Sequence, residues 1–178
     1  MPDEETPSSS MISEASGRKP LLSFREFLKT MADEAGVKGR RRRREEWLGA
    51  INRLLTQIRD WLREFDPDGV LDVEPYEVSR TEHDLGTYDA PALKIRLGAG
   101  EVNILPMGRD VPFMAIRGAS VAATEFAGRV DISDGFRKYN LYREMSEGKD
   151  LWQVKDDRNR LTYLDAESLG RILQDLLS

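Results

Sequence analysis

The sequence predicts an α+β fold, with an N-terminal helical hairpin packed on an antiparallel meander sheet of roughly five to seven strands, and with a C-terminal helix. Two observations support this prediction. Large apolar residues recur at spacings of three and four up to residue 65, whereas from residue 70 onward they alternate with polar residues. The helical spacing then returns after residue 165, and the chain contains no internal repeat.

The composition changes sharply after residue 20. Residues 1–20 are rich in Pro, Glu, Ser and Gly, and they offer little apolar surface to bury. We expect an acidic, disordered tail there, because so little burial does not offset the entropy of ordering. Residues 21–178 are expected to form a single α+β domain, in which 21–65 form the helical hairpin, 70–164 the antiparallel sheet and 165–177 the C-terminal helix.

The first helix of the hairpin is predicted to begin after Ser23, which matches a capping box with Glu26. Gly36 is its expected end, since glycine commonly stops a helix. Its apolar face consists of Phe24, Phe27, Leu28 and Met31. We expect this face to cover one flank of the second helix.

The second helix, residues 45–65, carries an apolar stripe that is wider than a surface helix needs. We therefore expect two neighbours to cover it, the first helix and the sheet. The turn residues 66–69, Asp-Pro-Asp-Gly, end this helix. The stripe consists of Trp47, Leu48, Ile51, Leu54, Leu55, Ile58, Trp61, Leu62 and Phe65.

The first strands of the sheet follow from alternation and turn residues. Residues 70–82 contain Pro75, which suits an edge strand because proline does not donate a backbone hydrogen bond. Residues 93–97 alternate apolar and charged side chains, and Gly98-Ala99 fits a two-residue hairpin turn. This turn places Ile95 opposite Val102 and Leu93 opposite Ile104, so apolar side chains meet.

The later strands are predicted in the same way. Asp134-Gly135 is a strong hairpin signal, and a two-residue turn there places Val130 opposite Tyr139 and Asp131 opposite Lys138. Residues 152–154 form another strand, 156–159 turn the chain, and 161–163 return. Residues 107–126 are expected to form a long loop with a short strand near 113–116. Asp165 is the expected N-cap of the last helix.

Composition excludes several classes of function. The formal net charge of −5 argues against a surface devoted to nucleic acid. The absence of cysteine excludes disulfides, thiolate zinc sites and thiol nucleophiles. The acidic N-terminus does not fit a signal peptide, and no apolar run is long enough to span a bilayer. We therefore expect a cytoplasmic protein without a membrane partner.

The densest charge feature is a basic cluster formed by Lys38, Arg40, Arg41, Arg42, Arg43 and Arg44. Guanidinium groups at this density would bind phosphates, and such binding would be sensitive to salt. However, no aromatic residues interleave the run as a single-strand stacking platform requires. The alternative is a solvated helix turn or a contact with another protein.

The sequence does not assemble a catalytic constellation. The one histidine, His83, is flanked by Glu82 and Asp84 in a polar segment typical of an exposed loop. Carboxylates near Lys94 lack the acid two residues before it that a nuclease-type metal site needs, because that position is Ala92. We therefore assign no catalytic residue, no metal site and no cofactor.

Three functions are consistent with these observations. The leading hypothesis is a soluble, non-enzymatic accessory protein that contacts another macromolecule, foremost another protein, through its sheet face, its tail or the arginine cluster. The second is a module that binds nucleic acid or phosphate through the basic cluster. The third is a small-molecule binder whose sheet curls around a pocket roofed by the C-terminal helix and lined by residues such as Tyr139 and Trp152.

Overall fold

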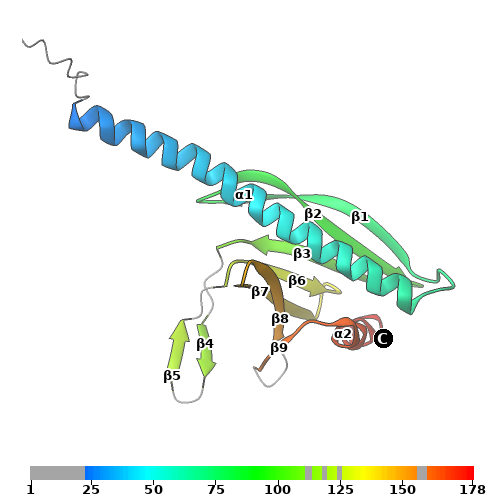
Figure 1. Ribbon diagram of the computed structural model, residues 1–178. Helices are drawn as coiled ribbons and strands as arrows, with labels where there is room; N and C mark the ends of the chain where they lie inside the picture. The colour runs from blue at the N-terminus through cyan, green and yellow to red at the C-terminus, as the bar shows by residue number, and fades with distance from the viewer. Residues whose placement is uncertain (1–22, 111–113, 118–119, 124–125, 156–159) are drawn as a thin grey trace, which may run out of the picture.

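The computed structural model describes residues 23–110, 114–117, 120–123, 126–155 and 160–178 (Figure 1). The expected tail at 1–20 and the expected turn at 156–159 lie outside these residues. Two helices are present in the described part of the chain, α1 (Phe24–Phe65) and α2 (Ala166–Leu177). The strands are β1 (Asp72–Glu82), β2 (Gly86–Leu97), β3 (Gly100–Gly108), β4 (Met114–Arg117), β5 (Ser120–Ala123), β6 (Arg129–Ser133), β7 (Lys138–Ser146), β8 (Lys149–Lys155) and β9 (Leu161–Tyr163).

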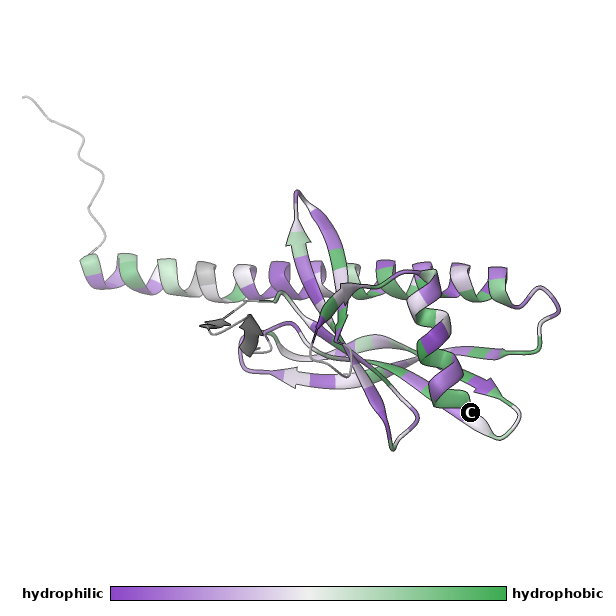
Figure 2. Cartoon of the chain, turned by 90° about the horizontal axis from the view of Figure 1, so that it is seen from below, coloured by the Kyte–Doolittle hydropathy of each residue, from purple (hydrophilic) through white to green (hydrophobic). Residues whose placement is uncertain are grey.

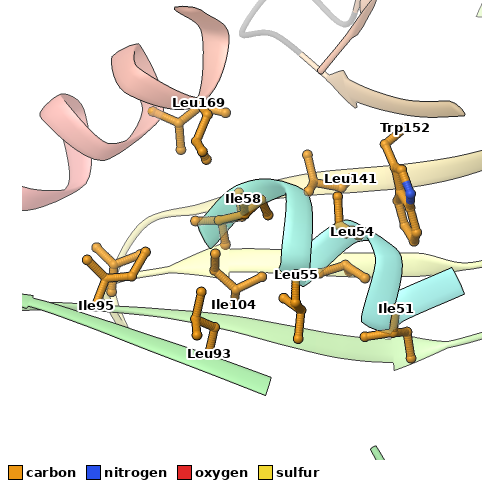
Figure 3. Close-up of a cluster of buried hydrophobic side chains, with 14 of the residues drawn as sticks. Ile51, Leu54, Leu55, Ile58, Leu93, Ile95, Ile104, Leu141, Trp152 and Leu169 are labelled. Carbon is orange, nitrogen blue, oxygen red and sulfur yellow. The ribbon is translucent and has the colours of Figure 1, made fainter. Parts of the chain in front are cut away.

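The predicted α+β class is confirmed. Seven strands form one antiparallel sheet in the order β1-β2-β3-β6-β7-β8-β9, which is a meander interrupted by the separate β4-β5 pair. The second half of α1 packs on this sheet, and α2 joins it at the core (Figure 3). β1 lies at one edge of the sheet, as Pro75 predicted.

The helical hairpin is replaced by one continuous helix of 42 residues. Its start is as predicted, because the Ser23 side chain accepts a hydrogen bond from the Glu26 backbone N–H and the Glu26 side chain accepts one from the Ser23 backbone. The predicted stop at Gly36 is wrong. Helix continues through Gly36 and Gly39, at a cost of about 0.5–1 kcal/mol per glycine relative to alanine, because good helix formers follow on the C-terminal side.

The two halves of the continuous helix α1 carry their apolar faces on different sides. At about 100° per residue, Phe24, Leu28 and Met31 lie on nearly one line, whereas Trp47, Leu54 and Ile58 lie on the side roughly half a turn away. The wide apolar face of residues 45–65 is covered by the sheet and by α2 rather than by a preceding helix. Its core members include Ile51, Leu54, Leu55 and Ile58, which contact side chains from several strands (Figure 3).

The predicted β2–β3 register is confirmed. Leu93 lies opposite Ile104, Ile95 opposite Val102, and Arg96 opposite Glu101. Gly98 in the turn has φ +58, the positive value that the hairpin requires. The pairing of apolar side chains on one face therefore sets the register of this hairpin as expected.

The predicted register of the β6–β7 hairpin is wrong by two residues. Val130 lies opposite Leu141, and Asp131 lies opposite Asn140. The loop holds four residues, 134–137, because the Asp134 carboxylate accepts hydrogen bonds from the backbone N–H groups of Phe136 (2.8 Å) and Arg137 (2.6 Å). This side-chain turn takes the place of the expected two-residue turn.

Segment 107–126 is also more regular than predicted. β3 continues to Gly108, and β4 pairs with β5 as an antiparallel hairpin in place of the expected loop. The short strand expected near 113–116 corresponds to β4.

Trp47 is the first buried residue among those of α1 whose burial the structure describes, and it is fully buried. Its ring lies 6.3 Å from that of Trp152, and its indole N–H donates a hydrogen bond to the Tyr88 hydroxyl (3.0 Å). Gly128 provides the space for it, since a Cβ there would lie 2.1 Å from the Trp47 ring. α1 is thereby fixed at the point where it enters the core.

Candidate protein-interaction surface on the projecting helix

The N-terminal part of α1 runs past the sheet (Figure 1), and we call residues 24–44, which precede the ion pair of Glu46 with the sheet, the projecting segment. Its N-terminal turns carry apolar residues beside polar ones, and its C-terminal turns are strongly polar (Figure 2). The apolar stripe of this segment consists of Phe24, Phe27, Leu28 and Met31, with exposed fractions of 74, 48, 50 and 49%. The rings of Phe24 and Phe27 stack at a centroid distance of 6.5 Å.

The apolar stripe faces away from the body of the protein. The helical period places it roughly half a turn from the buried face that begins at Trp47. The sheet therefore does not cover the stripe, and its four side chains stay in contact with solvent. Contiguous exposed apolar side chains of this kind mark interaction sites in soluble proteins.

The arginine cluster, Arg40–Arg44, follows the stripe on the same helix. Five consecutive helical residues turn through more than a full circle, so these side chains surround the helix instead of forming one face. Arg41 pairs with Glu45 at 2.8 Å, and Arg40 donates a hydrogen bond to the backbone carbonyl of Gly36. Within the described part of the chain, no carboxylate pairs with Arg42, Arg43 or Arg44.

The β1–β2 turn lies close to the arginine cluster. His83 and Asp84 form a hydrogen-bonded pair there at 2.9 Å, and the His83 side chain is almost fully exposed. The hydrogen bond from His83 lowers the pKa of Asp84, and the charges of Arg43 and Arg40 lower it further. His83 therefore belongs to an exposed turn, as its sequence context predicted.

A junction network of charged side chains joins α1 to the sheet just after the projecting segment ends. Arg143 of β7, with a side chain only 1% exposed, donates hydrogen bonds to Glu46 of α1 and to Asp150 of β8. Arg53 reaches Asp150 at 2.6 Å, and Arg109 reaches Glu46 at 3.3 Å. Each carboxylate is thus shared between two arginines, and the network anchors α1 to the sheet next to the projecting segment.

The network sets the ionisation of both carboxylates. Burial alone would raise the pKa of Glu46, but the hydrogen bonds and charges of Arg143 and Arg109 outweigh it and lower that pKa. Burial likewise opposes ionisation of Asp150, whereas Arg143 and Arg53 lower its pKa below the usual range. Folding therefore favours the charged form of both groups.

We expect this network to contribute stability that is present near neutral pH and lost in acid. Because the folded-state pKa values of Glu46 and Asp150 are lowered, the unfolded chain binds protons first as pH falls below about 4.5. The free energy of unfolding, measured by urea denaturation from pH 7 to pH 3, should fall less steeply in Glu46→Gln. The exposed Glu64→Gln on the same helix is the control. Equal slopes for Glu46→Gln and the native chain would contradict this assignment.

A shallow hollow lies beside α2, at the place where the sequence suggested a roofed pocket. Tyr139 lines it as expected, together with Lys155, Arg160 and Arg171. Trp152 does not, because it packs against Trp47 in the core. The small-molecule hypothesis therefore stays a prediction, because this hollow alone is not sufficient to support it.

Sequence reasoning identified the basic cluster. It assigned Phe24, Phe27, Leu28 and Met31 to a contact with the second helix, and it missed the junction network. The stripe could have been recognised from its helical phase, which differs from that of residues 47–62. Arg143 carries a weaker signal, since it stands two residues after Leu141 and thus at an inward-facing strand position. Its partners Glu46 and Asp150 are distant in sequence, and no local pattern pairs them.

Comparisons with known proteins assign no relative. No protein-family model matches this chain, and no match is found among curated proteins or solved structures. In the described ranges, no group of three or more His, Cys, Asp or Glu side chains is arranged to hold a metal ion. No helix of the described chain is both long enough and apolar enough to cross a membrane.

Proposed function

We propose that this is a non-enzymatic interaction protein that contacts a partner protein through the projecting segment of α1. The supporting observation is the apolar stripe, four large side chains that are about half or more exposed and face away from their own core. These exposed side chains do not stabilise the monomer. Burying a large apolar side chain in an interface would contribute roughly 1.5–3 kcal/mol.

The rest of the molecule is consistent with a scaffold for this segment. The buried half of α1 fills the sheet, and the junction network holds the helix at its exit from the core. The sequence also offers few groups for catalysis, with no cysteine and one histidine. A cytoplasmic location is part of the proposal, supported by the absence of cysteine.

Photo-crosslinking tests the proposed surface. A photoreactive phenylalanine analogue at position 27 should give a discrete crosslinked product in a lysate of the native cells. Phe136, which is 99% exposed in the β6–β7 loop, is a matched control position. We expect the product at position 27 to disappear when Met31→Asp places a charge in the stripe. Identical products at both positions, or none at position 27, would show that the stripe is not an interaction site.

Binding of nucleic acid or phosphate through Lys38 and Arg40–Arg44 is the second candidate function. The ring of guanidinium groups around the helix favours it, because a helix lying in the major groove meets phosphates on both sides. The formal net charge of −5 opposes it. Parallel titrations with a DNA duplex and with an acidic protein distinguish this function from protein binding.

A further inference from the structure

We infer that the partner presents an apolar groove with an acidic rim, and that the projecting segment binds in this groove as a helix. This inference rests on the proposed function and adds the chemistry of the partner. Three observations support it, namely the spacing of the apolar anchors, the position of the cations along the same line, and the charge of the rest of the molecule.

The anchors have the spacing of a helix that docks in a groove. Phe24, Phe27, Leu28 and Met31 stand at positions i, i+3, i+4 and i+7, the pattern by which amphipathic helices insert into apolar grooves. The stripe covers only about two turns. A coiled coil with a second copy of the chain needs about three to four heptads of such residues. A preformed groove is therefore the better match.

The same line of the helix continues into positive charge. Counted from Phe24, Lys38 and Arg42 follow at 14 and 18 residues, which returns them to the side of Leu28 and Met31. Lys38 begins roughly 10 Å beyond Met31 along the axis, at 1.5 Å per residue. A groove that receives the stripe would thus meet these cations at one end, and carboxylates there would complement them.

Charge is distributed unevenly between the projecting segment and the rest of the chain. Residues 24–44 contain eight Lys or Arg and three Asp or Glu, which is a net charge of +5. Since the whole chain carries −5, the remaining residues carry −10. A long polyanion or an anionic membrane is larger than the projecting segment and would also be repelled by the net negative charge of the rest of the molecule. An acidic groove of limited size engages the segment alone.

The apolar stripe and the cations contribute differently to binding. Full burial of four large apolar side chains would yield on the order of 6–12 kcal/mol, and the stripe is already partly covered. Association costs an estimated 4–15 kcal/mol, so the stripe alone supports weak binding at most. Charge complementarity at Lys38 and Arg42 supplies faster association and a fixed orientation.

Calcium-loaded calmodulin is a suitable probe, because it is an acidic protein whose apolar grooves open only with calcium. The full chain, carrying a fluorophore on Ser178→Cys, is titrated with calmodulin and followed by anisotropy. We expect micromolar or tighter binding with calcium, and at least tenfold weaker binding with EGTA. Phe27→Ser with Met31→Ser, and separately Lys38→Gln with Arg42→Gln, should each weaken binding at least tenfold. Circular dichroism confirms that these exposed substitutions leave the fold intact.

Parallel titrations use a 20-base-pair DNA duplex and vesicles of phosphatidylcholine and phosphatidylserine at the same salt concentration. Binding to calcium-loaded calmodulin that exceeds binding to both anionic probes supports the inference. Equal binding with calcium and EGTA, no binding to calmodulin, or tighter binding to duplex or vesicles overturns it. Should the crosslink at position 27 form while calmodulin fails to bind, the interaction function stands and only the groove chemistry is wrong.

Discussion

Replacing Arg143 with methionine is expected to lower the free energy of unfolding by about 3–5 kcal/mol, the usual cost of breaking a buried ion pair by removing one partner. Arg143 is 1% exposed, and it also donates a hydrogen bond to the backbone carbonyl of Ala127 at 3.3 Å. Without it, Glu46 and Asp150 would face each other as two carboxylates with fewer donors. The loss therefore includes the repulsion that Arg143 now offsets.

Chemical denaturation of Arg143→Met at pH 7 measures this effect. Arg53→Gln is the matched control, since Arg53 pairs with the same Asp150 from a side chain that is 63% exposed. Exposed ion pairs contribute about 0–1 kcal/mol, so the control should change little. If Arg143→Met costs no more than Arg53→Gln, the network is not a significant source of stability.

Gly128→Ala is expected to destabilise the protein by about 3 kcal/mol or more, which combines overpacking with an unfavourable backbone conformation. A Cβ at residue 128 would lie 2.1, 2.6 and 2.9 Å from three carbons of the Trp47 ring. Trp47 is fully buried, and Gly128 has φ +150, so neither the ring nor the backbone relaxes cheaply.

Gly135→Ala separates the two contributions, because Gly135 also has positive φ (+93) but no atom within 4 Å of an added Cβ. Unfolding midpoints in urea, followed by tryptophan fluorescence, should fall much further for Gly128→Ala than for Gly135→Ala. Adding Trp47→Leu to Gly128→Ala should recover part of the loss. A loss no larger than that of Gly135→Ala would show that Trp47 does not press on Gly128.

Local rules accounted for much of the fold. Alternation over residues 93–97 and the Gly98-Ala99 turn predicted the β2–β3 register correctly, because apolar pairs on one face leave little choice. The same reasoning misplaced the β6–β7 register by two residues, since the Asp134 carboxylate forms the turn and glycine alone does not. The helix break at Gly36 failed because a single glycine costs less than the flanking helix formers contribute.

The candidate site was only half accessible to sequence reasoning. Arginines at 40–44 are visible in any sequence, whereas the exposure of Phe24 and Met31 depends on the phase of a continuous helix that was expected to be two. The junction network joins residues nearly a hundred positions apart, Glu46 with Arg143 and Arg53 with Asp150. Such pairs follow from tertiary packing, which local patterns do not encode.

The unbroken course of α1 has a mechanical consequence. Trp47 lies sixteen positions after Met31, which amounts to roughly 24 Å of helix. A partner bound to the first turns of α1 is therefore held at that distance and in a fixed direction from the sheet. Inserting one residue between Gly36 and Arg40 would rotate the bound partner about the helix axis by about 100° while moving it only 1.5 Å along that axis.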